Sequence, residues 1–116
     1  MEDSDAARVG EAAHEAYEAY GLVKPWPGVR IVRKGHPLLS DGSIGKAAMY
    51  ESGMELIYID YDYVDSKAIL REIFMHEVAH VLAYRVHGPG IAEHGREFLA
   101  TCTRVSPRNF CTAYLE

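Results

Sequence analysis

Apolar positions recur with helical spacing in three segments of the chain. The first covers residues 4–20, the second runs from Asp65 or Ser66 to Val86, and the third covers residues 94–105. Each is followed within a few residues by glycine or proline, which end helices. The second segment is apolar around much of its circumference, and this pattern predicts a helix buried at the centre of a domain.

The stretch between the first two helical segments is typical of β-strands. Residues 29–34 are rich in β-branched side chains, and residues 45–51 and 54–60 predict two strands joined by a tight turn at Ser52-Gly53. Because hairpin strands run antiparallel, we expect a small, three-stranded, mostly antiparallel sheet. Met54–Asp60 is the candidate for its exposed edge. The order of elements predicts an α+β fold with one domain over residues 1–116.

Composition narrows the classes of partner. The chain has 116 residues, a formal net charge of −5 and 48% hydrophobic residues, which is enough for one packed core. Its basic residues are scattered, so nucleic acid is an unlikely partner for this domain alone. No apolar run approaches the length of a membrane span, and the acidic, alanine-rich N-terminus does not resemble a signal peptide. We therefore predict a cytoplasmic protein; its oligomeric state stays open.

The two cysteines, Cys102 and Cys111, have a spacing that fits neither a redox pair nor a zinc ribbon. Free cysteine is usually buried, and disulfides are rare in the cytoplasm. The expectation is therefore two reduced thiols in the core.

The central helical segment contains the strongest chemical motif, His76-Glu77-Val78-Ala79-His80. Side chains four residues apart share one face of a helix, so the two imidazoles can converge on one metal ion. Glu77 is turned about 100° from His76 and would act on metal-bound water. The alternative is a solvated helix face with two histidines. Because unpaired polar groups are costly in a buried helix, metal ligation is the better interpretation.

A catalytic zinc site needs a third protein ligand and one open position. The candidates downstream are His87, Glu93, His94 and Glu97. His94 is best placed, because it precedes Phe98 by four residues and should share the core-facing side of the last helix. His87 sits on a glycine-flanked turn, which favours a surface position.

The sequence His76-Glu77-Val78-Ala79-His80, followed after thirteen residues by His94-Gly95-Arg96-Glu97-Phe98, resembles the SprT-like zinc metallopeptidases. The resemblance implies a minimal zincin-like fold with Zn²⁺ as cofactor. It also implies His76, His80 and His94 as ligands, His94 on the C-terminal helix, and Glu77 as general base. Arg96 departs from the family, whose members often have proline there. Neither the zinc ribbon nor the DNA-binding tails of larger members are seen, so their DNA-linked role is not carried over.

A second resemblance competes with the first. Ile57-Tyr58-Ile59-Asp60 and Arg71-Glu72-Ile73-Phe74 are similar to segments of the ImmA/IrrE-type regulatory peptidases. Those enzymes use a glutamate as third ligand at the position that His94 would occupy, which makes this resemblance the runner-up.

The function predicted from these residues is that of a zinc metalloendopeptidase that hydrolyses a polypeptide substrate by Glu77-assisted attack of zinc-bound water. Tyr58 and Tyr84 are candidates for stabilising the oxyanion or contacting substrate, although tyrosines serve more often in packing. Two alternatives remain: a regulatory protease that cuts one partner, and a non-catalytic, metal-stabilised binding module.

Overall fold

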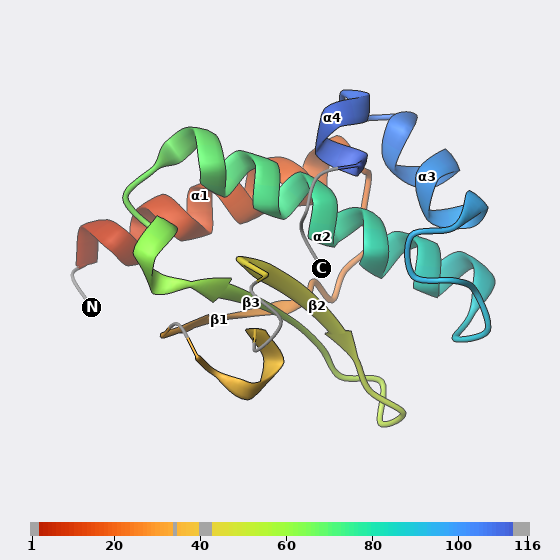
Figure 1. The fold of residues 1–116 in the computed structure, drawn as a ribbon, viewed down its shortest axis with the longest axis horizontal. Coiled ribbons are helices and arrows are strands. Elements are labelled where there is room, and N and C mark those ends of the chain that lie inside the picture. Colours follow the sequence, from red (N-terminus) through yellow and green to blue (C-terminus); the bar gives the residue numbers. More distant parts are fainter. Residues whose placement is uncertain (1–2, 34, 40–42, 113–116) are drawn as a thin grey trace.

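The computed structural model describes residues 3–33, 35–39 and 43–112, and it places the helices on one face of a three-stranded sheet (Figure 1). This arrangement confirms the predicted α+β fold. In chain order the elements are α1 (Asp3–Ala19), β1 (Gly28–Val32), the 3-10 turn η1 (Pro37–Leu39), β2 (Gly45–Met49), β3 (Glu55–Asp60), the 3-10 turn η2 (Tyr61–Tyr63), α2 (Lys67–His87), α3 (Arg96–Thr103) and α4 (Arg108–Cys111).

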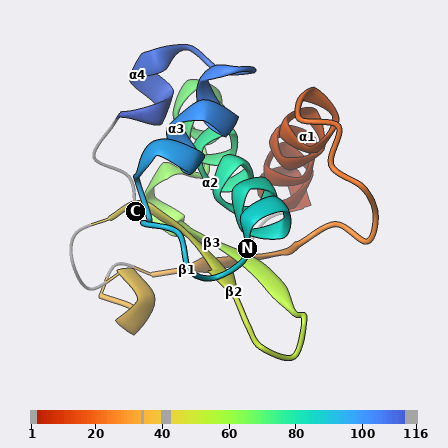
Figure 2. The same cartoon turned by 90° about the vertical axis from the view of Figure 1, so that its right-hand side faces the viewer.

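Helix α2 is the central element, as its apolar pattern predicts. It begins after Ser66, whose hydroxyl accepts a hydrogen bond from the Ile69 amide at 3.3 Å, and it ends at Gly88 with a φ of 83°. All nine residues from 73 to 81 are buried. Figure 2 shows why: α1 lies on one side of α2, α3 and α4 lie on the other, and the sheet lies beneath. The buried part of α2 therefore packs against α1, against α3 and α4, and against the sheet.

The sheet has the strand order β1-β3-β2, with β1 parallel and β2 antiparallel to β3. It is therefore mixed rather than mostly antiparallel, and the prediction of Met54–Asp60 as an exposed edge is wrong. Composition explains the order: β3 contributes Ile57 and Ile59, which are fully buried, so it occupies the centre. The two edge strands are β1 and β2, and the residues of β2 are small or polar apart from Met49.

The register decides which strand residues face α2. Gly45 and Ala47 of β2 pair with Ile59 and Ile57, on the sheet face covered by the helices. Tyr58 lies between these two isoleucines and therefore on the opposite face. The sheet thus presents small residues of β2, rather than tyrosine, towards the motif helix.

Helix α1 is fixed to the motif helix through Tyr20. The Tyr20 hydroxyl donates to the Met75 carbonyl at 2.8 Å and lies 2.7 Å from the Ser106 hydroxyl. Burial raises the pKa of Tyr20, so its phenol stays protonated as the donor. One side chain thus joins α1, the residue before His76, and the turn before α4.

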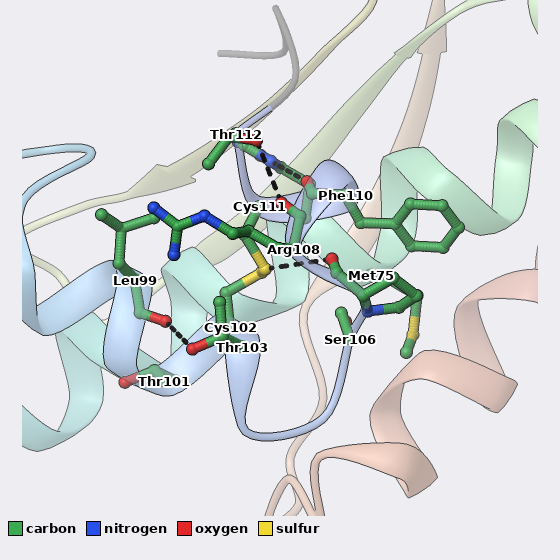
Figure 3. Close-up of a disulfide and its surroundings, with 12 residues drawn as sticks. Met75, Leu99, Thr101, Cys102, Thr103, Ser106, Arg108, Phe110, Cys111 and Thr112 are labelled. Atoms are coloured by element: carbon green, nitrogen blue, oxygen red, sulfur yellow. Dashed lines mark hydrogen bonds between the residues drawn. A yellow bond between two sulfur atoms is a disulfide. The ribbon is translucent and has the colours of Figure 1, made fainter.

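The cysteines correct the expectation of reduced thiols. Cys102 of α3 and Cys111 of α4 form a disulfide with a Cα–Cα distance of 5.8 Å (Figure 3). The turn at Pro107 folds α4 back on α3, which brings two residues nine positions apart within bonding range. Spacing along the chain alone does not reveal this reversal.

The remaining predictions concern boundaries. The third helix begins at Arg96 rather than at residue 94, because Gly95 is its N-cap with extended backbone angles. His94 therefore precedes α3 instead of lying on it. Phe110 of α4 is partly buried and packs against the core. Over residues 3–33, 35–39 and 43–112, no helix is long and apolar enough to cross a membrane.

Candidate metal centre

Three imidazole rings converge where α2 meets the segment before α3. The Nε2 atoms of His76 and His80, one helical turn apart, are 3.3 Å from each other. The Nε2 atom of His94 lies 3.2 Å from that of His76 and 3.1 Å from that of His80. The three nitrogens form a nearly equilateral triangle, although His94 follows His76 by 18 residues and His80 by 14 residues in the sequence.

The size of this triangle fits a bound transition metal. Zinc–nitrogen distances of about 2.0–2.1 Å with tetrahedral angles place ligand atoms about 3.3 Å apart. The three observed separations are 3.1–3.3 Å. A neutral imidazole with its proton on Nδ1 presents a lone pair at Nε2, and three such lone pairs at this separation can converge on one cation. The three histidines could therefore hold a metal ion through their Nε2 atoms.

The orientation of His76 is set by a carbonyl group. Its Nδ1 atom lies 2.7 Å from the main-chain oxygen of Phe110, in α4. A carbonyl can only accept, so Nδ1 carries the proton and Nε2 keeps its lone pair. Metal-binding histidines typically have such an outer partner, which fixes both tautomer and ring angle.

Phe98 contacts all three imidazole rings. Its fully buried ring stacks on that of His80, with a centroid distance of 4.1 Å and an interplanar angle of 23°. The rings of His76 and His94 lie 5.0 and 5.3 Å from it. Phe98 is the last residue of the segment His94-Gly95-Arg96-Glu97-Phe98. Its close-packed ring limits the rotation of the three imidazoles.

Glu77 is fully buried next to the histidines, and β2 comes close to it. A Cβ atom at Gly45 would lie 2.6 Å from Ile73 Cγ2 and 3.3 Å from Glu77 Oε2. Real Cβ atoms do not approach other atoms as closely as 2.6 Å. Glycine at the start of β2 therefore lets the edge strand pack directly on the helix that carries the carboxylate.

One side of the triangle is open to solvent. His76 and Glu77 are fully buried and His80 is 8% exposed, but His94 is an exposed residue. A cavity of about 150 Å³ adjoins His80. It is lined by residues of β2, of α2 and of the segment that leads to His94. These residues are Ala47 and Met49 of β2, His80 and Tyr84 of α2, and Pro89, Ile91 and Glu93. This cavity gives access to the site on the side of His80.

The structure separates the two candidate tyrosines. Tyr84 lines the cavity beside His80. Tyr58 lies on the outer face of the sheet, where its hydroxyl is 3.4 Å from that of Tyr50 and its ring lies beside His36. The hydrogen bond with Tyr50 raises the pKa of Tyr58. The described contacts of Tyr58 are thus on the face turned away from α2.

The other candidate ligands do not join the triangle. His87 is exposed at the end of α2, and Glu93 lines the rim of the cavity. Glu97, in the first turn of α3, lies 3.8 Å from the Arg96 guanidinium. Among residues 3–33, 35–39 and 43–112, His76, His80 and His94 are the group whose donor atoms converge.

Comparison with known proteins agrees with this geometry. The model of the SprT-like family matches residues 28–114, three quarters of the chain. The chain belongs to the SprT-like family. No match was found among curated proteins or solved structures. The matched SprT-like region begins at β1 and includes both the motif helix and His94, and α1 lies N-terminal to it.

Sequence reasoning missed two features of this SprT-like site. The Phe110 carbonyl is a main-chain group, so no residue type marks it. Gly45 did carry a signal, because an isolated glycine at the start of a strand indicates a close approach of another element. Only the folded arrangement identifies that element as the Glu77 side of α2.

Proposed function

We propose that this SprT-like protein is a zinc-dependent metallopeptidase, with His76, His80 and His94 as zinc ligands and Glu77 as general base. The observation that supports it best is the triangle of three Nε2 atoms next to a fully buried glutamate on the same helix. Three imidazoles without thiolate donors suit zinc and other borderline transition metals better than oxygen-preferring ions such as magnesium or calcium, and among these zinc also fits the resemblance to the SprT-like metallopeptidases.

The residues divide the chemistry of peptide hydrolysis between them. A bound zinc ion would supply Lewis acidity, which lowers the pKa of water towards 7 and polarises a substrate carbonyl. Glu77 accepts the proton of the attacking water and then delivers it to the leaving amine. The protein interior around Glu77 excludes competing water, which strengthens its electrostatic interactions with the reacting groups.

The proposed binding site for a polypeptide substrate lies along the edge strand β2. Because β2 is an outer strand of the sheet and packs next to α2, an extended peptide could pair with its outer side by strand addition. Ala47 and Met49 of β2 line the cavity beside His80, so a side chain of that peptide would enter it. Tyr84, on the opposite wall, is the better placed of the two tyrosines for contacting substrate.

Metal removal tests this proposal. Freshly purified protein should cleave an unfolded polypeptide such as reduced, denatured casein, and a strong chelator should abolish cleavage. Adding back stoichiometric zinc should restore it, because the apoprotein keeps its core while losing the group that activates water. Fragment formation is followed by mass spectrometry.

The same assay separates catalysis from a binding role. A metal-stabilised binding module would show a lower melting temperature after chelation, because zinc binds the folded state, but no fragments under any condition. Cleavage that persists at full rate after chelation would also contradict the proposal, because catalysis would then not depend on zinc. Cleavage confined to one native partner would instead favour a regulatory protease.

A further inference from the structure

The disulfide lies one residue from a group that orients the metal site. Cys111 of α4 is bonded to Cys102 of α3, and both cysteines are buried, with exposures of 2% and 0% (Figure 3). Phe110 directly precedes Cys111, and its carbonyl oxygen accepts the 2.7 Å hydrogen bond from His76 Nδ1. The covalent link and the outer partner of His76 are therefore parts of the same short helix.

Helix α4 has only four residues, and a helix of this length is not stable without tertiary support. Its start is fixed through Ser106, whose hydroxyl lies 2.7 Å from that of Tyr20. Its end is fixed by the disulfide to α3. Because the Phe110 carbonyl lies between these two attachments, releasing one of them allows the carbonyl to move away from His76.

We infer that the Cys102–Cys111 disulfide is a positioning element of the metal site. It holds the Phe110 carbonyl where that group fixes the ring angle and tautomer of His76. The inference depends on the metal-binding part of the proposed function. It adds that the affinity of the site for zinc is set by the oxidation state of two cysteines that bind no metal themselves.

Reduction makes this dependence measurable. A phosphine cleaves the sulfur–sulfur bond by giving two electrons to it; water supplies the oxygen of the phosphine oxide and the two protons of the resulting thiols. A dithiol achieves the same by exchange and is itself oxidised to a disulfide. In either case α4 loses its covalent link to α3. Loss of an outer partner typically weakens metal binding by about 10- to 100-fold, and we expect a change of that size.

The experiment measures the dissociation constant for zinc by competition with a chromophoric chelator. It compares the oxidised protein with the same protein after phosphine reduction and anaerobic removal of the phosphine. The double variant Cys102→Ser/Cys111→Ser is a third sample, in which no thiol can bind zinc directly. Val9→Ala, in the core on α1, serves as a matched control for a general loss of stability. Circular dichroism tests whether each sample is folded.

A second readout reports on His76 itself. In nitrogen-15 NMR spectra of the metal-free oxidised protein, the Nδ1–H group of His76 should give a proton signal protected from exchange by its hydrogen bond. That signal should weaken or disappear in the reduced protein and in the double serine variant, and persist in Val9→Ala. If the disulfide contributed only to overall stability, breaking it would not selectively weaken the Nδ1–H signal of His76.

The inference is supported if the reduced protein and the double variant both bind zinc about 10- to 100-fold more weakly, while Val9→Ala does not. Equal affinity in the oxidised and reduced states would overturn it, as would an equal loss in Val9→Ala. Unfolding of both the reduced protein and the double variant would also overturn it, since the bond would then be a general folding requirement. Failure of the oxidised protein to bind zinc would instead remove the proposed function, and absence of peptidase activity alone would leave this inference intact.

Discussion

Replacing Glu77 with glutamine is expected to lower peptidase turnover by about 10²- to 10⁴-fold while leaving zinc content unchanged. Glutamine has nearly the shape of glutamate, so it fills the fully buried position beside Gly45 without a cavity or a clash. It cannot accept a proton from the attacking water, and general base catalysis is lost. Zinc is measured by elemental analysis of the same sample that is assayed for cleavage.

The matched control is Glu72→Gln on the same helix, which removes a half-buried carboxylate that lies outside the motif. It should cleave at the wild-type rate. If Glu77→Gln also cleaved at the wild-type rate with zinc bound, Glu77 would not be the general base. If it lost zinc together with activity, its role would be structural rather than catalytic.

Replacing His94 with alanine is expected to weaken zinc binding by more than the 10- to 100-fold typical of losing an outer partner, because a direct ligand is removed. His94 completes the triangle with separations of 3.1 and 3.2 Å from the two motif histidines. The dissociation constant is measured by chelator competition. The folded core should survive, since His94 is exposed and precedes α3.

His87→Ala is the matched control, because it removes an exposed histidine that was also a candidate ligand. It should leave zinc affinity unchanged. A larger loss in His87→Ala than in His94→Ala would show that the third ligand had been assigned to the wrong residue.

The grouping of the three histidines could be predicted largely because its main signals are local. His76, Glu77 and His80 lie on one helix, where spacing alone determines which side chains share a face. His94 was identified by its distance of four residues from Phe98, although it lies before Gly95 rather than on α3. The ring centroids of His94 and Phe98 are nevertheless 5.3 Å apart. The two side chains are therefore neighbours, as predicted, although His94 does not lie on the helix.

The features that could not be predicted depend on contacts between distant segments. The pairing of β1 with β3 places β3 at the centre of the sheet, which an analysis of hairpins alone does not reveal. The Cys102–Cys111 bond depends on the reversal at Pro107, and the Phe110 carbonyl belongs to the main chain. In each case the deciding interaction is tertiary, and local pattern carries no information about it.

The central claim is that His76, His80 and His94 together bind one zinc ion. Elemental analysis of freshly purified wild-type protein, prepared without chelators, tests it most directly. We expect one zinc ion per chain. Protein that contains no zinc, and takes up none when zinc is supplied in slight excess, would contradict it.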